Sequence, residues 1–207
     1  MSSKFVLYYF NGRAAGEAAR LLLIYGGETW EDHRVSFAEW SEFKKNAPFE
    51  KLPYLEFDGI KLPESYAINR YLAKKYGLAG KDDLEQARVD AIADLHKDFF
   101  MDSREFSRVS SGKQAGDKEK VRQESFEPIV KRCYGVFNDI LKKSPSGFFA
   151  DSGLTWADFV VSQWYIRMKE IAPDLAERYP EIDKHLDRVH NVPQIKDYVA
   201  KRGSFPF

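Results

Sequence analysis

The N-terminal part of the chain alternates between short apolar runs and amphipathic stretches. Residues 4–10 are rich in aromatic and β-branched side chains, which favours a buried strand. Residues 16–27 place alanines and leucines on one helical face and end in two glycines, as a helix does. The continuing pattern predicts a strand within 29–37, a helical segment at 40–45, a hairpin that turns at Asp58 and Gly59, and a helix at 65–77.

This order, βαβαββα, predicts a small α/β domain with helices packed on a mixed sheet. Residues 77–85 are polar and contain glycine, which is typical of a linker. Beyond them the pattern is helical, with long amphipathic stretches at about 85–110 and 117–143 and shorter ones from 155 onward. We therefore predict an α/β domain at 1–79 and an all-helical domain at 80–207.

Two helix starts carry residues that can cap backbone N–H groups. Ser65 stands before the apolar stripe of the helix at 65–77 and is predicted to be its N-cap, while Gly77 ends that helix. Thr155 and Asp158 stand three positions apart before another apolar run, which predicts a capping box. We assign this pair to folding and not to chemistry.

The balance of charges argues against a polyanionic partner. Lys and Arg together number 32, and so do Asp and Glu, so no net field attracts nucleic acid or an anionic membrane surface. The single cysteine, Cys133, excludes an intramolecular disulfide and fits a reducing compartment. No apolar stretch approaches the length of a membrane span, and the N-terminus does not resemble a signal peptide. We expect a soluble cytoplasmic protein.

The four histidines, His33, His96, His185 and His190, lack the spacing of metal ligands. His185 and His190 are predicted to share a helix, but a separation of five positions does not place them on one face. We therefore expect surface histidines in this helix and no metal site.

Two adjacent tyrosines, Tyr8 and Tyr9, end the first apolar run just before a polar loop. Successive side chains on a strand point to opposite faces, so only one of the pair can face a cleft while the other packs or faces solvent. The alternation alone does not choose between them, and an aromatic residue on a strand is otherwise a core residue.

Four motifs, YYFNGRAAGE, PFEKLPYLEFDG, ESYAINRYLAKKYGLAG and LTWADF, resemble in order and spacing those of cytosolic glutathione S-transferases, most nearly the sigma class. The resemblance covers nearly the whole chain. It implies a thioredoxin-like N-terminal domain, an all-helical C-terminal domain and a homodimer. It also implies that the protein transfers the glutathione thiol to electrophilic hydrophobic small molecules, with glutathione as co-substrate and no cofactor.

The family's Tyr-Phe-x-x-Arg pattern makes Tyr9 the catalytic tyrosine. A phenol, whose pKa lies near 10, stays protonated and can donate a hydrogen bond to sulfur, which favours the thiolate over the thiol. Arg13 completes the pattern. It is expected either to support catalysis or to form a salt bridge with Glu17.

The resemblance also implies how glutathione is bound. A cis peptide bond before Pro53 turns the backbone of Leu52 outward to pair with the cysteinyl residue. Ser65, at a helix start, gives its hydroxyl and amide to the γ-glutamyl carboxylate. The implied glutathione-binding set is Tyr9, Trp40, Lys44, Lys51, Leu52, Pro53, Glu64, Ser65 and, from the partner subunit, Asp98.

Each of these residues also has an ordinary structural role. Trp40 and Lys44, matched to positions that hold the glycyl carboxylate, would otherwise be surface residues of a short helix. Ser65 serves equally as a plain N-cap, and Asp98 as a charge on a helix. Glu64 stands where the family commonly has glutamine, and its carboxylate can still hold the γ-glutamyl ammonium.

The second substrate is expected between the domains, near Phe10, Ala14, Ala15, Phe100 and Glu105. Ala14 replaces the glycine that usually follows the arginine, so the backbone of this loop is expected to differ. Sigma-class prostaglandin D synthases carry an arginine at the Ala15 position and a tryptophan at the Glu105 position. Two rival functions are a glutathione-dependent isomerase of that type, which these two differences disfavour, and a non-catalytic hydrophobic-ligand carrier or crystallin-like protein.

Overall fold

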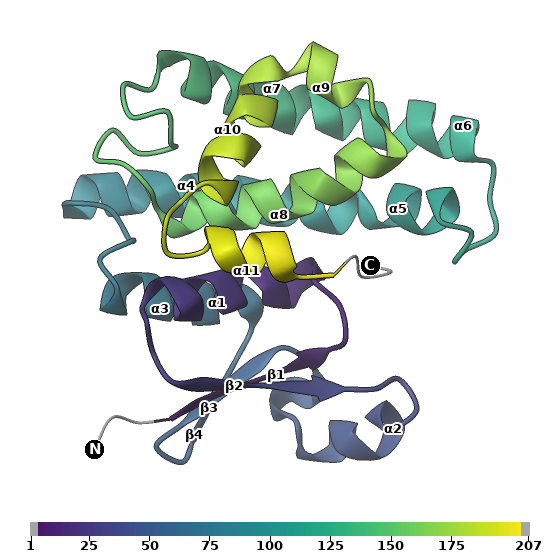
Figure 1. The fold of residues 1–207 in the computed structure, drawn as a ribbon. Helices are drawn as coiled ribbons and strands as arrows, with labels where there is room; N and C mark the ends of the chain where they lie inside the picture. The colour runs from purple at the N-terminus through teal and green to yellow at the C-terminus, as the bar shows by residue number, and fades with distance from the viewer. Residues whose placement is uncertain (1–3, 204–207) are drawn as a thin grey trace. The chain divides into compact units, whose positions relative to one another are not determined.

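The computed structural model describes residues 4–203 and divides into two compact units (Figure 1). The first unit is Met1–Ala79 with Asn191–Phe207, and the second is Gly80–His190. Residues 191–203, which the sequence pattern placed in the helical domain, thus belong with the α/β unit. The physical reason is a set of hydrogen bonds from this segment to the first helix, described below.

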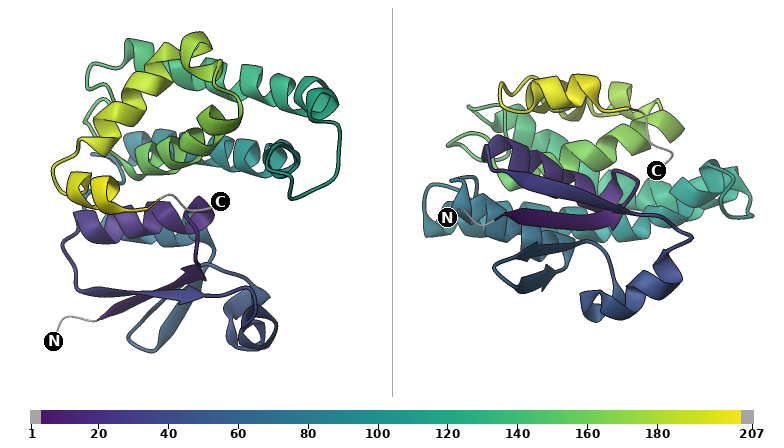
Figure 2. Two further views of the ribbon diagram at one scale, coloured as in Figure 1. Left: turned by 45° about the vertical axis from the view of Figure 1, so that its right-hand side comes forward. Right: turned by 60° about the horizontal axis from the view of Figure 1, so that its bottom comes forward.

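The first unit is a four-stranded mixed sheet with helices on both faces (Figures 1 and 2). Its elements are β1 (Phe5–Phe10), α1 (Ala14–Tyr25), β2 (Trp30–Val35), α2 (Trp40–Phe43), β3 (Tyr54–Phe57), β4 (Ile60–Pro63), α3 (Ser65–Lys75) and α11 (Lys196–Lys201), with 3-10 turns at Lys44–Asn46 and Pro48–Glu50. The strand order is β2-β1-β3-β4; β1 pairs parallel with β2 and antiparallel with β3. The predicted mixed sheet and its element order are therefore confirmed.

The alternation along β1 decides what covers each face of the sheet. Helices α1 and α3 lie on one side of the sheet (Figure 1). Phe5, Leu7 and Tyr9 are the buried residues of β1, and contact of the Tyr9 ring with Gly16 places them on the side of α1. Tyr8 lies on the opposite face, where its ring stacks on Tyr54 with centroids 4.4 Å apart. Burial raises the pKa of Tyr8. The two adjacent tyrosines thus have opposite environments, as a strand requires.

The β3–β4 hairpin turns at Asp58 and Gly59, as predicted. Asp58 has φ 49° and Gly59 has φ 76°, and two successive positive φ angles are what a type I′ turn needs. The following helix differs from the prediction in one respect. Its N-cap is Glu64, with φ 70° and ψ 115°, and Ser65 is already the first helical residue.

The second unit consists of helices. They are α4 (Asp83–Asp102), α5 (Arg104–Ser110), α6 (Lys118–Val121), α7 (Glu127–Lys143), α8 (Trp156–Ile171), α9 (Leu175–Arg178) and α10 (Pro180–His190), with a π-helical turn at Arg122–Phe126. Helix α4 begins at Asp83 because the Asp82 carboxylate accepts the Glu85 N–H at 2.9 Å. The linker is therefore shorter than the stretch 77–85 suggested.

The capping box of α8 is confirmed, and it explains a wrong prediction about His185. Asp158 accepts hydrogen bonds from the Thr155 hydroxyl and backbone N–H, and its other oxygen lies 2.8 Å from His185 Nε2. His185 has no exposed surface and is not a surface histidine. A buried carboxylate needs donors on both oxygens, and the imidazole supplies one. Among residues 4–203, no helix is both long enough and apolar enough to cross a membrane.

Candidate glutathione site

The predicted binding residues of the first unit come together at one end of the sheet. The β1–β3 register pairs Tyr8 with Tyr54, so the next residues along, Tyr9 and Pro53, face each other across the sheet end. The β3–β4 register likewise brings Glu64 beside Pro53. Three segments therefore lie side by side at this end of the sheet: the end of β1, the residues before β3 and the residues before α3. They are brought together although Tyr9 and Pro53 are far apart in sequence.

Tyr9 lies at the end of β1, and the start of α1 holds it closely. Its side chain is 8% exposed. A Cβ atom placed on Gly16 would come within 2.4 Å of the Tyr9 ring, so the ring packs directly on the helix backbone. The Ala15 N–H donates to the Tyr9 hydroxyl oxygen at 3.3 Å. This bond uses an oxygen lone pair and not the phenolic proton, so it leaves that proton's donor capacity intact.

The loop between Tyr9 and α1 has an unusual backbone at the position where the sequence departs from the family. Ala14 has φ 23°, in the left-handed region that favours glycine. Arg13 is the N-cap residue of α1 and makes no side-chain capping bond. Glu17, the residue expected to pair with Arg13 in one of its two proposed roles, binds Arg20 and Arg202. The role of Arg13 stays a prediction.

The start of α3 brings the backbone N–H groups of its first turn next to Glu64, whose backbone is strained. The first N–H groups of an α-helix have no partner within the helix, and they attract anions. Glu64, just before this helix, is exposed and lies outside the main allowed backbone regions. Strain of this kind costs about 1–3 kcal/mol and often marks a functional site. The N–H groups beside Ser65 and the Glu64 carboxylate thus offer sites for a carboxylate and an ammonium group, respectively.

The residues expected to hold the rest of the tripeptide lie on α2 and the segment that follows it. Lys44 lies at the end of α2 and pairs with Glu50 at 3.2 Å, beside the exposed Lys51. The peptide bond between Leu52 and Pro53 is cis, as the resemblance implies. In the described chain, Leu52 lies outside the helices and strands, and its backbone makes no hydrogen bond to other backbone groups there.

An aromatic group connects α2 with the end of β1. The Phe10 ring lies 5.3 Å from the Trp40 ring at 74° and 4.9 Å from the Phe37 ring at 22°. Phe10, Ala14 and Ala15 are each partly exposed. The predicted second-substrate residues of the first unit therefore adjoin Tyr9 and Trp40.

Three predicted site residues belong to the second unit. Asp98, on α4, and Glu105, on α5, are exposed. Phe100 is half-buried, and its ring lies 4.5 Å from that of Trp164 at 65°. Their expected roles toward the substrates stay predictions.

Sequence reasoning missed a buried ion pair on α1, close to the loop that follows Tyr9. Glu17 and Arg20 lie fully buried on α1 and bond to each other at 3.0 Å. The signal was present, since two opposite charges three positions apart interrupt an otherwise apolar stretch. Gly16 stands at the same helix start. Within the described residues, no group of three or more His, Cys, Asp and Glu side chains is arranged to hold a metal ion.

Comparisons with known proteins agree with this geometry. The family profile described as "Glutathione S-transferase, N-terminal domain" matches residues 5–74, and that described as "Glutathione S-transferase, C-terminal domain" matches residues 101–202. The chain is 40% identical to "Probable glutathione S-transferase 6" of Caenorhabditis elegans, over 97% of this chain and 98% of that protein. It is 37% identical to "Glutathione S-transferase 1" of Ascaris suum, over 99% of each.

Solved structures give the same result. A Necator americanus glutathione S-transferase described as monomeric is 38% identical, with a TM-score of 0.92 over 99% of this chain and 100% of that one. A Nu-class enzyme from Haemonchus contortus is 37% identical, with a TM-score of 0.90 over the same shares. A prostaglandin synthase D from Nilaparvata lugens is 31% identical, with a TM-score of 0.85 over 97% and 100%. The sequence, the thioredoxin-like sheet and the helical second unit together place this chain in the glutathione S-transferase family.

Proposed function

We propose that this protein conjugates glutathione to hydrophobic electrophilic small molecules, with Tyr9 as the residue that activates the thiol. The observation that carries the proposal is the setting of the Tyr9 hydroxyl, fixed at a strand end by contact with Gly16 and by the Ala15 N–H. A hydroxyl held this way can aim its proton at one point. That point is the expected position of the glutathione sulfur.

The required free energy is modest. A free cysteine thiol has a pKa near 8.5, so only a few per cent is thiolate at neutral pH. Lowering that pKa by about two units needs about 2.7 kcal/mol and makes thiolate the major form. Because the Ala15 N–H donates to the phenolic oxygen, it polarises the O–H bond and strengthens the hydroxyl as a donor. The thiolate then attacks the electrophilic carbon, and the leaving group departs with its electron pair.

The charges around Tyr9 suit a zwitterionic tripeptide. We assign the γ-glutamyl carboxylate to Ser65 and the N-terminus of α3, and the γ-glutamyl ammonium to Glu64. The cysteinyl backbone would pair with Leu52, and the glycyl carboxylate would lie near Trp40, Lys44 and Lys51. Opposite charges at the two ends of the site would fix the direction of the peptide.

The test is conjugation of glutathione to a generic aryl halide by the wild type and by two variants. Tyr9→Phe is expected to lower the conjugation rate by about 10- to 100-fold, since the lost hydrogen bond acts on the thiolate. Glutathione affinity should stay nearly intact. Tyr8→Phe is the matched control and should be nearly silent, because Tyr8 lies on the opposite face. Equal thiol pKa values of bound glutathione in wild type and Tyr9→Phe, from ultraviolet titration, would refute the mechanism.

The alternative function, a glutathione-dependent isomerase of the prostaglandin D synthase type, is supported by one relative, the Nilaparvata lugens structure named as prostaglandin synthase D. We nevertheless expect little such activity here compared with aryl-halide conjugation. Ala15 lacks a side chain that could supply the supporting cation, and Glu105 replaces an aromatic wall with an exposed carboxylate. Efficient conversion of the endoperoxide to the D-series product would overturn this expectation. A carrier without catalysis would show no conjugation at all.

We further propose that the protein acts in the cytoplasm without a cofactor.

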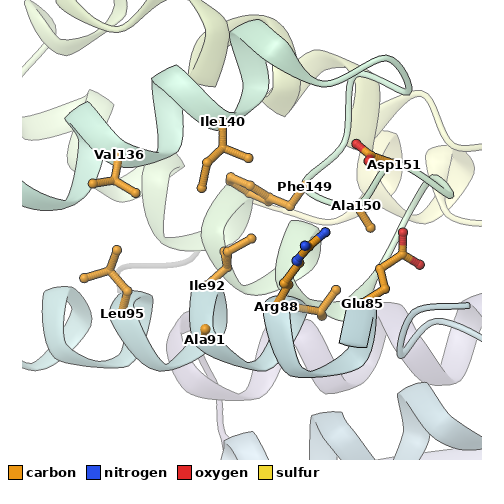
Figure 3. Close-up of a pocket in the computed structure, with 11 residues that line it drawn as sticks. Glu85, Arg88, Ala91, Ile92, Leu95, Val136, Ile140, Phe149, Ala150 and Asp151 are labelled. Atoms are coloured by element: carbon orange, nitrogen blue, oxygen red, sulfur yellow. The ribbon is translucent and has the colours of Figure 1, made fainter. Parts of the chain in front are cut away.

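We also propose that the protein is a homodimer. Two exposed apolar features support self-association. Phe49 is 70% exposed. A hollow of about 430 Å³ lies between α4 and α7, with Ile92 and Leu95 on one side and Val136 and Ile140 on the other (Figure 3). Burying such surface would stabilise a dimer. We also propose that the protein is of the sigma-like class. The alternative is the Nu class, to which the Haemonchus contortus relative belongs.

A further inference from the structure

A buried ionic cluster lies beneath the loop that follows Tyr9. Arg20 is its centre, with a fully buried side chain. Its Nε donates to the Asp32 carboxylate at 3.1 Å, and one terminal nitrogen donates to Glu17 at 3.0 Å. The cluster therefore joins α1 to β2 inside the first unit. Such a pairing is costly to break, because removal of one charge leaves another buried and uncompensated.

Arg20 also holds the backbone that carries Tyr9. The nitrogen that binds Glu17 donates to the Gly12 carbonyl at 2.6 Å, and the other terminal nitrogen donates to the Phe10 carbonyl at 3.4 Å. The central carbon of the guanidinium lies 5.8 Å from the centroid of the Tyr9 ring. The planar fork of arginine thus fixes both ends of the short turn after Tyr9, which no lysine could do.

The far side of the cluster is supplied by the C-terminal segment. The Arg202 guanidinium donates to Glu17 Oε1 at 2.6 Å, and the Tyr198 hydroxyl donates to the same oxygen at 3.2 Å. Arg202 has only 4% of its side chain exposed. Glu17 therefore binds α11 through one oxygen and Arg20 through the other. A continuous chain of bonds runs from α11 to the Tyr9 loop.

From this geometry we infer that Arg20 is a positioning residue for Tyr9, and that helix α11 acts on Tyr9 through Glu17 and Arg20. The inference rests on the proposed role of Tyr9. Without Arg202, the Glu17 carboxylate would attract the Arg20 guanidinium more strongly. The hydrogen bonds from Arg20 to the Phe10 and Gly12 carbonyls would then weaken. The Tyr9 hydroxyl would then donate less well to the sulfur. The C-terminal segment would thereby tune thiol activation and not only the stability of the fold.

The main test is Arg202→Met, which keeps much of the side-chain length but removes the charge. We expect the thiol pKa of bound glutathione, from ultraviolet titration, to rise by about half a unit. The conjugation rate at pH 6.5 should then fall about threefold. The Michaelis constant for glutathione should change less than twofold. Tyr198→Phe should shift the pKa in the same direction by a smaller amount, and Arg20→Lys by a larger one if that variant folds.

The matched control is Arg178→Met. Arg178, like Arg202, forms ion pairs, but its partners are Glu127 and Asp174 within the helical unit. It should lower the midpoint of thermal unfolding without moving the thiol pKa. If Arg202→Met behaved the same way, its role would be structural only and the inference would fail.

A double variant separates this inference from the proposed function. In a Tyr9→Phe background, Arg202→Met should cause no further shift of the thiol pKa, because both changes act through one hydroxyl. Additive shifts would show that Arg202 acts by another route and would overturn the inference alone. A Tyr9→Phe variant with normal conjugation would instead overturn the proposed function.

Discussion

At the scale of single residues, the position of the Tyr9 ring requires that residue 16 has no Cβ atom. The ring of Tyr9 lies against the α1 backbone at Gly16, where even a methyl group would meet ring carbons at 2.4 and 2.7 Å. Both contacts are well inside van der Waals range, and one of the two groups would have to move. Since Gly16 belongs to a helix and Tyr9 to a strand end, the side chain of Tyr9 is the easier group to displace.

We therefore predict that Gly16→Ala lowers the conjugation rate at least tenfold and destabilises the protein by about 1–3 kcal/mol through overpacking. The control is Gly135→Ala on α7, where an added Cβ meets no atom within 4 Å. That change should leave conjugation unchanged and stabilise the helix by about 0.5–1 kcal/mol. Urea unfolding and the aryl-halide assay supply both readouts. A fully active Gly16→Ala protein would show that the Tyr9 ring has room to move.

His96 provides a second prediction, which concerns pH. Burial lowers the pKa of His96 to about 3, whereas an unfolded histidine titrates near 6.5. Between these values the unfolded chain binds a proton that the folded one does not, so stability falls as pH falls below about 6.5. From pH 7 to pH 5 this group should account for a loss of about 2 kcal/mol.

The measurement compares the free energy of unfolding at pH 7 and pH 5 in wild type and His96→Leu. The leucine variant should lack that part of the pH dependence, whatever its stability at pH 7. Its loss between the two pH values should be smaller than in wild type by about 2 kcal/mol. An unchanged difference would mean that another group titrates in this range.

Single-residue environments could be predicted from sequence only in part. Strand alternation required Tyr8 and Tyr9 to face opposite ways, but only the family motif selected Tyr9. His185 was misjudged because its partner, Asp158, stands 27 positions away in sequence. For Glu17 and Arg20, the two opposite charges three positions apart were visible in the sequence, but their connection to Arg202, 185 positions from Glu17, was not. Burial of charge depends on distant partners, and local patterns do not reveal them.

At the scale of elements, the patterns located nearly every helix and strand of the first unit. Apolar periodicity and turn residues fixed β1, α1 and the hairpin at Asp58 and Gly59. The ends were less well predicted, because the cap of α3 depends on backbone angles. Serine is a favoured N-cap residue, yet Glu64 takes that position with a strained backbone and moves Ser65 into the helix. Stability alone would not select this arrangement.

This strain leads to a prediction at the start of α3. Glu64→Gly should relieve the positive φ and stabilise the protein by about 1 kcal/mol, after allowance for the flexibility of glycine in the unfolded chain. It should also raise the glutathione concentration for half-saturation about tenfold, because the proposed ammonium partner is lost. Glu64→Gln is the control. It keeps the backbone strain and a neutral acceptor, so it should gain no stability and lose less affinity. A Glu64→Gly protein less stable than wild type would contradict the strain argument.

At the scale of the whole molecule, the sequence predicted two units and the change from α/β to all-helical structure. It did not predict that residues 191–203 would join the first unit. Amphipathic periodicity identifies a helix but does not show which core that helix joins. Here the choice depends on Tyr198 and Arg202, whose partner Glu17 lies on the first helix of the chain. The oligomeric state is still harder to predict, because hydrophobic periodicity within one chain does not show how two copies of that chain associate.

The remaining prediction concerns that assembly and starts from Asp98, an exposed carboxylate on α4. In the proposed homodimer it reaches the γ-glutamyl ammonium bound by the other subunit. Loss of a charge-assisted hydrogen bond typically costs about 1.5–3 kcal/mol. Asp98→Ala should therefore raise the glutathione concentration for half-saturation, with a smaller effect on the chemical step.

Mixed dimers decide which site Asp98 serves. One subunit carries Tyr9→Phe and the other carries Asp98→Ala. If the carboxylate acts across the interface, both defects fall in the site that contains Tyr9→Phe, and the other site is intact. The mixed dimer should then show half the wild-type activity with normal glutathione affinity. If its only active site instead binds glutathione weakly, Asp98 serves its own subunit and the composite site is wrong. A protein that stays monomeric at assay concentrations, by sedimentation, would refute the homodimer itself.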